Sequence, residues 1–192
     1  MTLFLERLAL AFDFPVLEWI QSNLRCGFLD AVMPPLTRLS DAGIIWIVFT
    51  LICLAMKKHR KTGAGMAVAL VLGLIICNGI LKPVVARIRP YDYQLAQFGR
   101  EISLLIPKET DFSFPSGHTI AAFEAAVALF LSNKKLGIPA IVLAVLTAFS
   151  RMYLYVHYPS DVIVSVVLGT AFAFAGKAIV DAVAKKRAAK KA

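Results

Sequence analysis

The chain has 192 residues, 59% of them hydrophobic, and a mean hydropathy of +0.73. Soluble domains are closer to half apolar, so this composition excludes an ordinary soluble enzyme and indicates a membrane protein. The net charge of +9 alone would also suit a nucleic-acid binder. However, Lys and Arg lie in short clusters between apolar runs, a pattern that indicates membrane topology and contact with anionic lipid headgroups rather than with nucleic acid.

The first 34 residues are mixed in polarity, with apolar residues at helical spacing on both sides of a break at Asp13 and Pro15. Amphipathic helices that carry Trp and Arg suit the membrane interface, so we expect an interfacial segment here. A helix packed on the bundle and an imperfect membrane span are the alternatives. Because Glu6, Arg7 and Asp13 interrupt the apolar stretch, we expect no cleaved secretory signal.

Five apolar runs follow, and they predict the membrane-spanning helices. They cover residues 43–56, 63–81, 119–131, 136–155 and 162–184. The first run is short for a hydrocarbon core of about 30 Å at about 1.5 Å per residue, so its helix should begin earlier, near Pro35. We therefore expect an all-α integral membrane bundle of five to six transmembrane helices with an N-terminal amphipathic segment.

The same pattern predicts one membrane-embedded domain. It comprises an interfacial segment 1–34, a helical bundle 35–184 and a basic cytoplasmic tail 185–192. Positive charge is concentrated in residues 57–61, the loop 133–135 and the tail, whereas the other polar segments balance their cations with acidic residues. The positive-inside rule therefore places the Lys-rich loops in the cytoplasm and the remaining polar segments on the outer face.

Three polar blocks fall on that outer face. They are residues 82–90 (KPVVARIRP), 115–118 (PSGH) and 150–161 (SRMYLYVHYPSD). Lys82, Arg89 and Arg151 are cations from three separate segments; a guanidinium binds phosphate oxygens in pairs, and an ammonium acts as a point charge. Together they predict a site for a highly charged oxyanion.

Two histidines accompany these cations. Ser116 and Gly117 precede an apolar run, so their backbone N–H groups and the Ser116 hydroxyl can bind an anion at a helix N-terminus. His118 on the first turn of that helix is then a candidate proton donor. His157 and Asp161 are four residues apart, so the carboxylate can accept one imidazole N–H and leave the other nitrogen free to attack.

This set of groups indicates phosphoryl transfer in two steps. His157 would attack phosphorus while His118 protonates the leaving oxygen, and water would then hydrolyse a phosphohistidine. The three cations would stabilise the equatorial oxygen charge that magnesium neutralises at other phosphotransfer sites. The sequence shows no acidic cluster with metal-ligand spacing, so we predict no metal and no cofactor.

At these residues the chain resembles the type-2 phosphatidic acid phosphatase family, which shares its site with bacterial acid phosphatases and vanadium haloperoxidases. The family pattern is K-x6-RP, then PSGH, then SR-x5-H-x3-D. It is met by Lys82, Arg89 and Pro90, by Pro115 to His118, and by Ser150, Arg151, His157 and Asp161. The resemblance implies a membrane bundle, a metal-independent phosphatase mechanism, His157 as nucleophile, Asp161 as its orienter and His118 as general acid.

In its length and in the sequence of its YLYVHYPSDV segment, the chain is most similar to small bacterial members of this family that act on undecaprenyl pyrophosphate. This similarity implies a lipid diphosphate substrate and a multi-pass protein of the bacterial cytoplasmic membrane, with its active site on the extracytoplasmic face. Phosphatidylglycerol phosphate and phosphatidic acid are alternative substrates. A lipid-binding or transport protein is the non-enzyme alternative, and the oligomeric state is left open.

Some polar and aromatic residues have no place in these motifs. We interpret Arg87 as a helix-end anchor or a headgroup contact, and Tyr153, Tyr155 and Tyr158 as part of an interfacial aromatic belt. Glu124 lies in an apolar helix, where it would form an interhelical hydrogen bond or be protonated; the functional alternative is a partner to an active-site cation.

Overall fold

The computed structural model describes residues 3–190, and within this range every regular element is a helix. Met1, Thr2, Lys191 and Ala192 lie outside it, including the last two residues of the predicted basic tail. The elements are α1 (Leu3–Leu8), the π-helical turn η1 (Ala9–Asp13), α2 (Phe14–Asn23), α3 (Gly27–Leu39), the 3-10 turn η2 (Asp41–Gly43), α4 (Ile44–Ala55), α5 (Arg60–Gly73), the π-helical η3 (Leu74–Leu81), α6 (Lys82–Val85), α7 (Pro90–Phe98), α8 (Gly117–Ser132), α9 (Lys134–Tyr153) and α10 (Pro159–Ala189).

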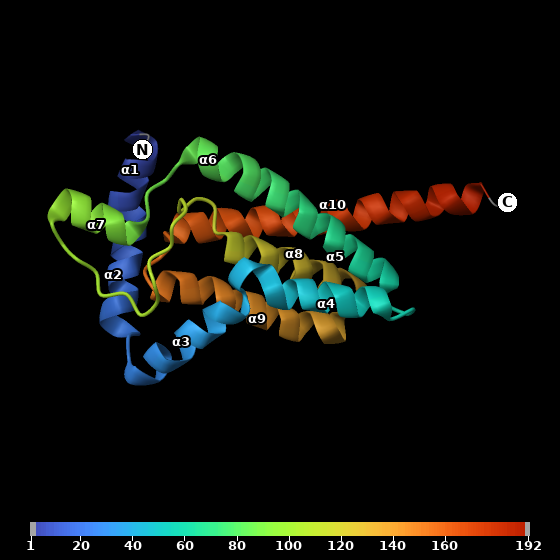
Figure 1. Cartoon of the computed structure of the whole chain (residues 1–192), viewed down its shortest axis with the longest axis horizontal. Coiled ribbons are helices and arrows are strands. Elements are labelled where there is room, and N and C mark those ends of the chain that lie inside the picture. Colours follow the sequence, from blue (N-terminus) through green and yellow to red (C-terminus); the bar gives the residue numbers. More distant parts are fainter. Residues whose placement is uncertain (1–2, 191–192) are drawn as a thin grey trace.

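The bundle is built around α8. Helices α4, α5, α8, α9 and α10 run along the long axis of the molecule, and α8 packs against the other four (Figure 1). Three alanines on α8, Ala122, Ala125 and Ala126, are fully buried, because small side chains let neighbouring helices approach closely. Helices α5 and α10 also pack tightly: a Cβ on Gly176 would collide with the backbone oxygen of Gly65.

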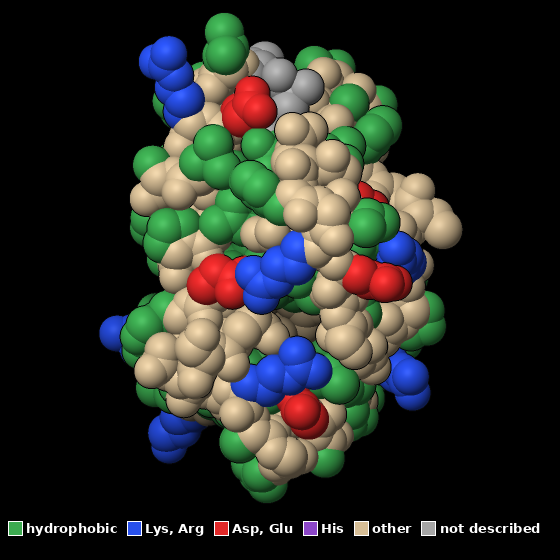
Figure 2. Space-filling view, turned by 90° about the vertical axis from the view of Figure 1, so that its left-hand side faces the viewer, with side chains coloured by type: hydrophobic (Ala, Val, Ile, Leu, Met, Phe, Trp, Pro, Cys, Tyr) green, Lys and Arg blue, Asp and Glu red, His purple; other side chains and the backbone are tan. Residues whose placement is uncertain are grey.

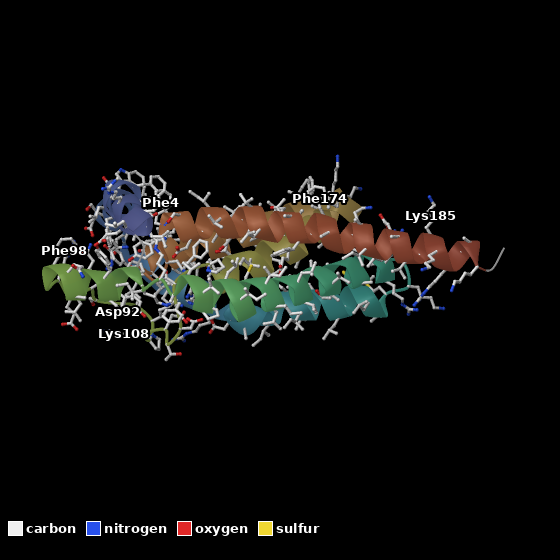
Figure 3. All side chains as sticks on the ribbon, turned by 90° about the horizontal axis from the view of Figure 1, so that it is seen from above. Phe4, Asp92, Phe98, Lys108, Phe174 and Lys185 are labelled. Atoms are coloured by element: carbon white, nitrogen blue, oxygen red, sulfur yellow. The ribbon has the colours of Figure 1, made fainter. Side chains whose placement is uncertain are left out.

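Several helices have the length and composition of membrane spans. Arg60–Phe98, Lys134–Tyr153 and Pro159–Ala189 are long and apolar enough to cross a bilayer, and the bent pair Gly27–Arg38 and Asp41–Ala55, with an angle of 47°, makes a fourth if it counts as one span. Large apolar side chains such as Val142, Val167 and Phe174 are more than half exposed, as lipid contact requires. Phe174 is labelled on α10 in Figure 3. The predicted class, an all-helical multi-pass membrane protein, is confirmed.

The N-terminal helices lie across one end of the bundle (Figure 1). Ala9, Leu17 and Ile20 are buried there in a second apolar cluster, which also contains Tyr91 and Tyr153. This packing on the bundle is the alternative to a purely interfacial segment that the sequence left open. The next helix, α3, begins at Gly27, eight residues before the predicted start near Pro35.

The tyrosines of the third motif do not form a belt. Tyr153, Tyr155 and Tyr158 are 2%, 2% and 0% exposed, so the prediction that they line the membrane interface is wrong. Tyr155 donates a hydrogen bond of 2.7 Å to Glu18 of α2. Because the loop after α9 folds back beneath the N-terminal helices, these aromatic rings serve as core at the end of the bundle.

The two ends of the bundle differ in charge. Figure 2 shows the end that carries α1, α2 and α7, where Lys and Arg side chains lie beside Asp and Glu side chains. Pairs at this end include Arg100 with Glu18 and Lys108 with Asp92. Lys185 lies at the opposite end, far from Asp92 and Lys108 (Figure 3).

Candidate active site

The three polar blocks meet at the end of the bundle near the N-terminal helices. In the first block, Lys82 begins α6 and Arg89 is the residue before α7. In the second, Ser116 caps α8, and Gly117 and His118 lie in its first turn. In the third, Arg151 lies in the last turn of α9, His157 in the loop that follows, and Asp161 in the first turn of α10. The site is therefore assembled from helix ends and from loops that are distant in sequence.

His157 is held between a cation and a carboxylate. Its Nε2 atom is 3.2 Å from Nη1 of Arg89, and its Nδ1 atom is 3.6 Å from Oδ2 of Asp161 and 3.5 Å from Oγ of Ser113. A guanidinium can only donate, so Nε2 must be the acceptor and the ring proton belongs on Nδ1, toward Asp161. This is the tautomer that leaves Nε2 unprotonated, with its electron pair directed toward Arg89.

The imidazole of His157 is neutral under ordinary conditions. Its side chain is 1% exposed, and burial, followed by the positive charges of Arg89 and Arg151, holds its pKa well below the usual range. A neutral imidazole can act as a nucleophile, which a protonated one cannot.

Asp161 is fully buried and has three donors besides His157. It accepts hydrogen bonds from Oγ of Ser113 at 2.5 Å, from Nη1 of Arg87 at 2.5 Å and from the backbone N–H of Tyr158 at 3.1 Å. The interpretation of Arg87 as a helix-end anchor or headgroup contact is wrong, because its side chain is 0% exposed and paired with carboxylates. The sequence placed Arg87 within the first motif block, but nothing in it showed that Arg87 or Ser113 would contact Asp161.

The three predicted phosphate-binding cations are each paired with a carboxylate of the loop between α7 and α8. Lys82 and Arg89 both bind Asp111, and Arg151 binds Glu109. Burial raises the pKa values of Glu109 and Asp111, but these cations outweigh it, so both pKa values lie below the ordinary range. In the sequence pattern, these acids only balance the positive charge of the outer polar segments.

The N-terminus of α8 uses part of its hydrogen-bonding capacity internally. The Ser116 hydroxyl caps the helix by accepting from Thr119, and the Ser116 backbone N–H donates to Oγ of Ser165 at 2.9 Å. Of the two Ser116 groups predicted to reach the anion, the backbone N–H thus donates within the protein, whereas the hydroxyl acts as an acceptor. Gly117 and His118 line the cavity, where the first N–H groups of a helix lack intrahelical acceptors.

His118 is oriented by Asp41. Its Nε2 atom lies 2.9 Å from Oδ1 of Asp41, and the His118 side chain is 15% exposed. Asp41 opens η2, where Ala42 and Gly43 take positive φ values of 50° and 71° and turn the chain from α3 into α4. Asp41 belongs to none of the three motif blocks.

A cavity of about 610 Å³ connects these polar groups to an apolar groove. Lys82, Arg89, Gly117, His118 and His157 line its polar end, and the groove lies between α4, α5 and α8. The lining residues of the groove include Ile47, Leu51, Leu70, Val71, Leu74 and Ala121.

Glu124 lines the cavity from α8. It is 1% exposed, and its Oε1 atom has no hydrogen-bond partner among the described residues. The side chain lies against Gly73 of α5, where a Cβ would collide with it.

In residues 3–190, no group of three or more His, Cys, Asp and Glu side chains is arranged to hold a metal ion.

Fold and site together define an all-helical membrane protein in which two histidines, Lys82 and Arg89 line one cavity, while Arg151 pairs with Glu109, which also lines it. The family model described as the PAP2 superfamily matches residues 62–185, so the chain belongs to the PAP2 superfamily. The predicted resemblance to the type-2 phosphatidic acid phosphatases is thereby confirmed.

Curated relatives of this chain include two undecaprenyl-diphosphatases and a phosphatidylglycerophosphatase. The undecaprenyl-diphosphatase of Sulfolobus acidocaldarius is 36% identical over 131 residues, which cover 68% of this chain and 61% of that protein. The undecaprenyl-diphosphatase BcrC of Bacillus subtilis is 30% identical over 146 residues, covering 76% and 72%. Phosphatidylglycerophosphatase B of Bacillus subtilis is 32% identical over 158 residues, also covering 76% and 72%.

Solved structures agree with this family. The crystal structure of LpxE from Aquifex aeolicus, 23% identical, covers 85% of this chain and 93% of that chain with a TM-score of 0.73, which shows the shared fold. A transmembrane PAP2 type phosphatidylglycerolphosphate phosphatase from Bacillus subtilis is 29% identical, with a TM-score of 0.63 and coverage of 83% and 80%.

Proposed function

We propose that this protein is a metal-independent membrane lipid phosphatase that hydrolyses a lipid diphosphate, undecaprenyl pyrophosphate to undecaprenyl phosphate, through a phosphohistidine on His157. One observation carries the proposal: a single cavity joins Lys82, Arg89 and the two histidines to an apolar groove between helices. A polar end for the headgroup and an apolar extension for the chain suit a lipid phosphate. The two undecaprenyl-diphosphatase relatives favour the diphosphate.

The reaction proceeds in two displacements. In the first, Nε2 of His157 forms a bond to the terminal phosphorus, the bond from phosphorus to the bridging oxygen breaks, and His118 gives its proton to that leaving oxygen. In the second, His118 takes a proton from water, the water oxygen attacks phosphorus, and the bond between phosphorus and nitrogen breaks to release phosphate. Asp161 stabilises the positive imidazole of the intermediate from the Nδ1 side.

Lys82, Arg89 and Arg151 bind the transferred phosphoryl group. Their preformed positive charge stabilises the equatorial oxygens in the transition state. The substrate phosphate must compete with Asp111 and Glu109, which pair with these same cations. A doubly charged terminal phosphate competes more strongly than a singly charged diester.

The lipid chain reaches the site sideways. Ile47 and Leu51 of α4 and Val71 of α5 line the cavity and are also 44%, 57% and 53% exposed. The groove is therefore open to the bilayer between these helices, which supports lateral entry of a lipid. Activity on a lipid diphosphate and on water-soluble pyrophosphate would test this, since equal efficiency on both would contradict lateral entry.

We further propose five spans, with the shorter apolar helix α8 as one of them, in a bacterial cytoplasmic membrane. The site would face outward, because the Lys-rich segments lie at the opposite end of the bundle (Figure 3). Those basic segments would contact anionic headgroups of the inner leaflet. Cysteine labelling at positions 58 and 101 from each side of the membrane would test this orientation.

Phosphatidylglycerol phosphate is the second candidate substrate. Phosphatidylglycerophosphatase B and the solved phosphatidylglycerolphosphate phosphatase of Bacillus subtilis favour it. Phosphate release from undecaprenyl pyrophosphate, phosphatidylglycerol phosphate and phosphatidic acid, compared in one detergent, separates the candidates. A lipid-binding or transport protein would release no phosphate from any of them and would bind lipid equally well in the His157→Ala variant.

A further inference from the structure

Arg87 joins two buried carboxylates behind the nucleophile. Its Nη1 atom is 2.5 Å from Oδ1 of Asp161, and its Nη2 atom is 2.7 Å from Oδ2 of Asp13. All three side chains are 0% exposed. The Tyr158 ring lies under the guanidinium, 3.7 Å from its carbon to the ring centroid. Asp13 comes from the N-terminal helices, so the bridge runs from that segment to the first turn of α10.

We propose that Arg87 and Asp13 are positioning residues for hydrolysis: through this bridge they fix the carboxylate of Asp161 and, through it, the imidazole of His157. The inference rests on the proposed role of His157 as nucleophile. It also gives the N-terminal helices a part in the reaction. Neither residue touches the cavity that binds the substrate, and each acts only through Asp161.

The two oxygens of Asp161 have different tasks. Oδ1 receives the Arg87 bond, whereas Oδ2 faces Nδ1 of His157 and accepts from Ser113. A carboxylate is rigid and planar, so any rotation that follows loss of the Oδ1 bond also moves Oδ2 away from the imidazole. The geometry at His157 therefore depends on a residue that does not contact it.

Asp13 holds Arg87 and α10 at the same time. Its Oδ1 atom accepts from the backbone N–H of Ser160 at 2.8 Å, and its Oδ2 atom accepts from the Ser160 hydroxyl at 2.8 Å. That hydroxyl in turn accepts from Nη1 of Arg87 at 2.8 Å. Ser160 immediately precedes Asp161, so Asp13 fixes both the guanidinium and the backbone that carries the orienting carboxylate.

The charge of Asp13 matters as well as its hydrogen bonds. A buried guanidinium shared between two carboxylates is attracted to both, and loss of one charge strengthens its hold on the other. Without the negative charge at Asp13, Arg87 draws Asp161 toward itself and neutralises it, so less negative charge remains to stabilise the positive imidazole. A planar fork with two parallel donors is needed for this bridge, and lysine cannot replace it.

The test combines kinetics with spectroscopy of the imidazoles. The chain has three histidines, so nitrogen-15 histidine labelling resolves the ring nitrogens of His157 from the other two. Asp13→Asn keeps the shape of the side chain and removes its charge, Arg87→Lys keeps the charge and removes the fork, and Ser160→Ala is a mild variant that removes one hydroxyl. Asp92→Asn is the matched control, because Asp92 is half exposed and its ion pair is with Lys108.

For Asp13→Asn and Arg87→Lys we expect kcat to fall by about tenfold to 100-fold, and for Ser160→Ala by about threefold, as for residues that orient a reacting group from behind. KM and the inhibition constant for vanadate should stay within about twofold of wild type, because the three phosphate-binding cations are unchanged. The His157 ring resonances should shift in the two charged-bridge variants and stay in place in Asp92→Asn.

An unchanged kcat in all three variants would overturn the proposal. So would a fall in kcat with unchanged His157 resonances, or a parallel loss of vanadate binding and melting temperature, which would indicate a purely structural bridge. The resonances do not depend on the lipid used. If wild type hydrolyses no lipid diphosphate, the proposed function fails, while the shift of the His157 resonances still decides whether the bridge positions the imidazole.

Discussion

The Nη1 atom of Arg89 lies 3.2 Å from Nε2 of His157, so the cation that is proposed to bind the phosphoryl group also contacts the nitrogen that is proposed to attack it. Arg89 is itself fixed by the backbone oxygens of Val156 and Asp111. The attacking atom and the charge that stabilises the transition state are thus adjacent before any substrate enters, and the phosphoryl group must displace this hydrogen bond before Nε2 can attack.

Replacement of Arg89 by lysine should lower kcat/KM by about 100-fold, the usual effect of losing one preorganised donor at a developing negative charge. The ammonium keeps the charge but cannot contact His157, Val156 and Asp111 together. Initial rates of phosphate release measure the effect. Arg100→Lys is the control, because Arg100 is exposed and pairs with Glu18. Equal losses in both variants would contradict the role given to Arg89.

Asp111→Asn should strengthen inhibition by vanadate by about threefold, because it removes a carboxylate that competes for Lys82 and Arg89. The gain is small, since the Asp111 side chain is half exposed and its ion pairs are screened by water. Glu101→Gln, in the same loop and exposed, makes the same charge change as a control. Weaker inhibition in Asp111→Asn would show that the carboxylate supports the site instead of competing for it.

Thermal stability should decrease as pH falls below about 6.5, the ordinary pKa of histidine. The folded state holds the pKa of His157 well below that value, so the unfolded state binds more protons in this window and is stabilised relative to the native state as pH falls. The lowered pKa values of Glu109 and Asp111 act with the same sign, but only below about pH 4. Melting temperatures between about pH 7 and about pH 5 should therefore decline less in His157→Gln, and identical slopes would argue against the neutral, buried imidazole.

Ala121→Phe should block the apolar groove. The larger ring enters the cavity beside Gly43 and should lower kcat/KM for a lipid diphosphate by about tenfold, or about 1.4 kcal/mol, while hydrolysis of water-soluble pyrophosphate stays unchanged. Ala171→Phe, at an exposed position on α10, controls for the added ring. Equal losses on both substrates would place the lipid chain elsewhere.

The membrane class and the convergence of the motif residues at one end of the bundle were predictable from sequence. Apolar runs report lipid contact directly, and Lys82, Arg89, His118, Arg151 and His157 stand at motif spacings that reflect shared chemistry. These five indeed surround one end of the bundle in the structure.

The partners of these residues were not predictable. Arg87 and Asp161 are separated by 74 residues, as are Arg87 and Asp13, and no local pattern reports a pairing across three chain segments. The sequence predicts that Tyr155 and Tyr158 lie at the membrane interface, because aromatic residues are common there. The fold of the loop buries them instead. Long-range packing decided each of these cases, and it depends on the whole bundle.

His157 is proposed to carry the phosphoryl group during the reaction. Purified protein is mixed, in excess chelator, with undecaprenyl pyrophosphate labelled in its terminal phosphate, and the reaction is quenched in alkali within one turnover. Because phosphohistidine survives alkali, we expect label on a peptide that includes His157. His157→Ala should show neither label nor phosphate release. Phosphate release at the wild-type rate by His157→Ala, or rapid turnover with no labelled His157 peptide, would contradict the account.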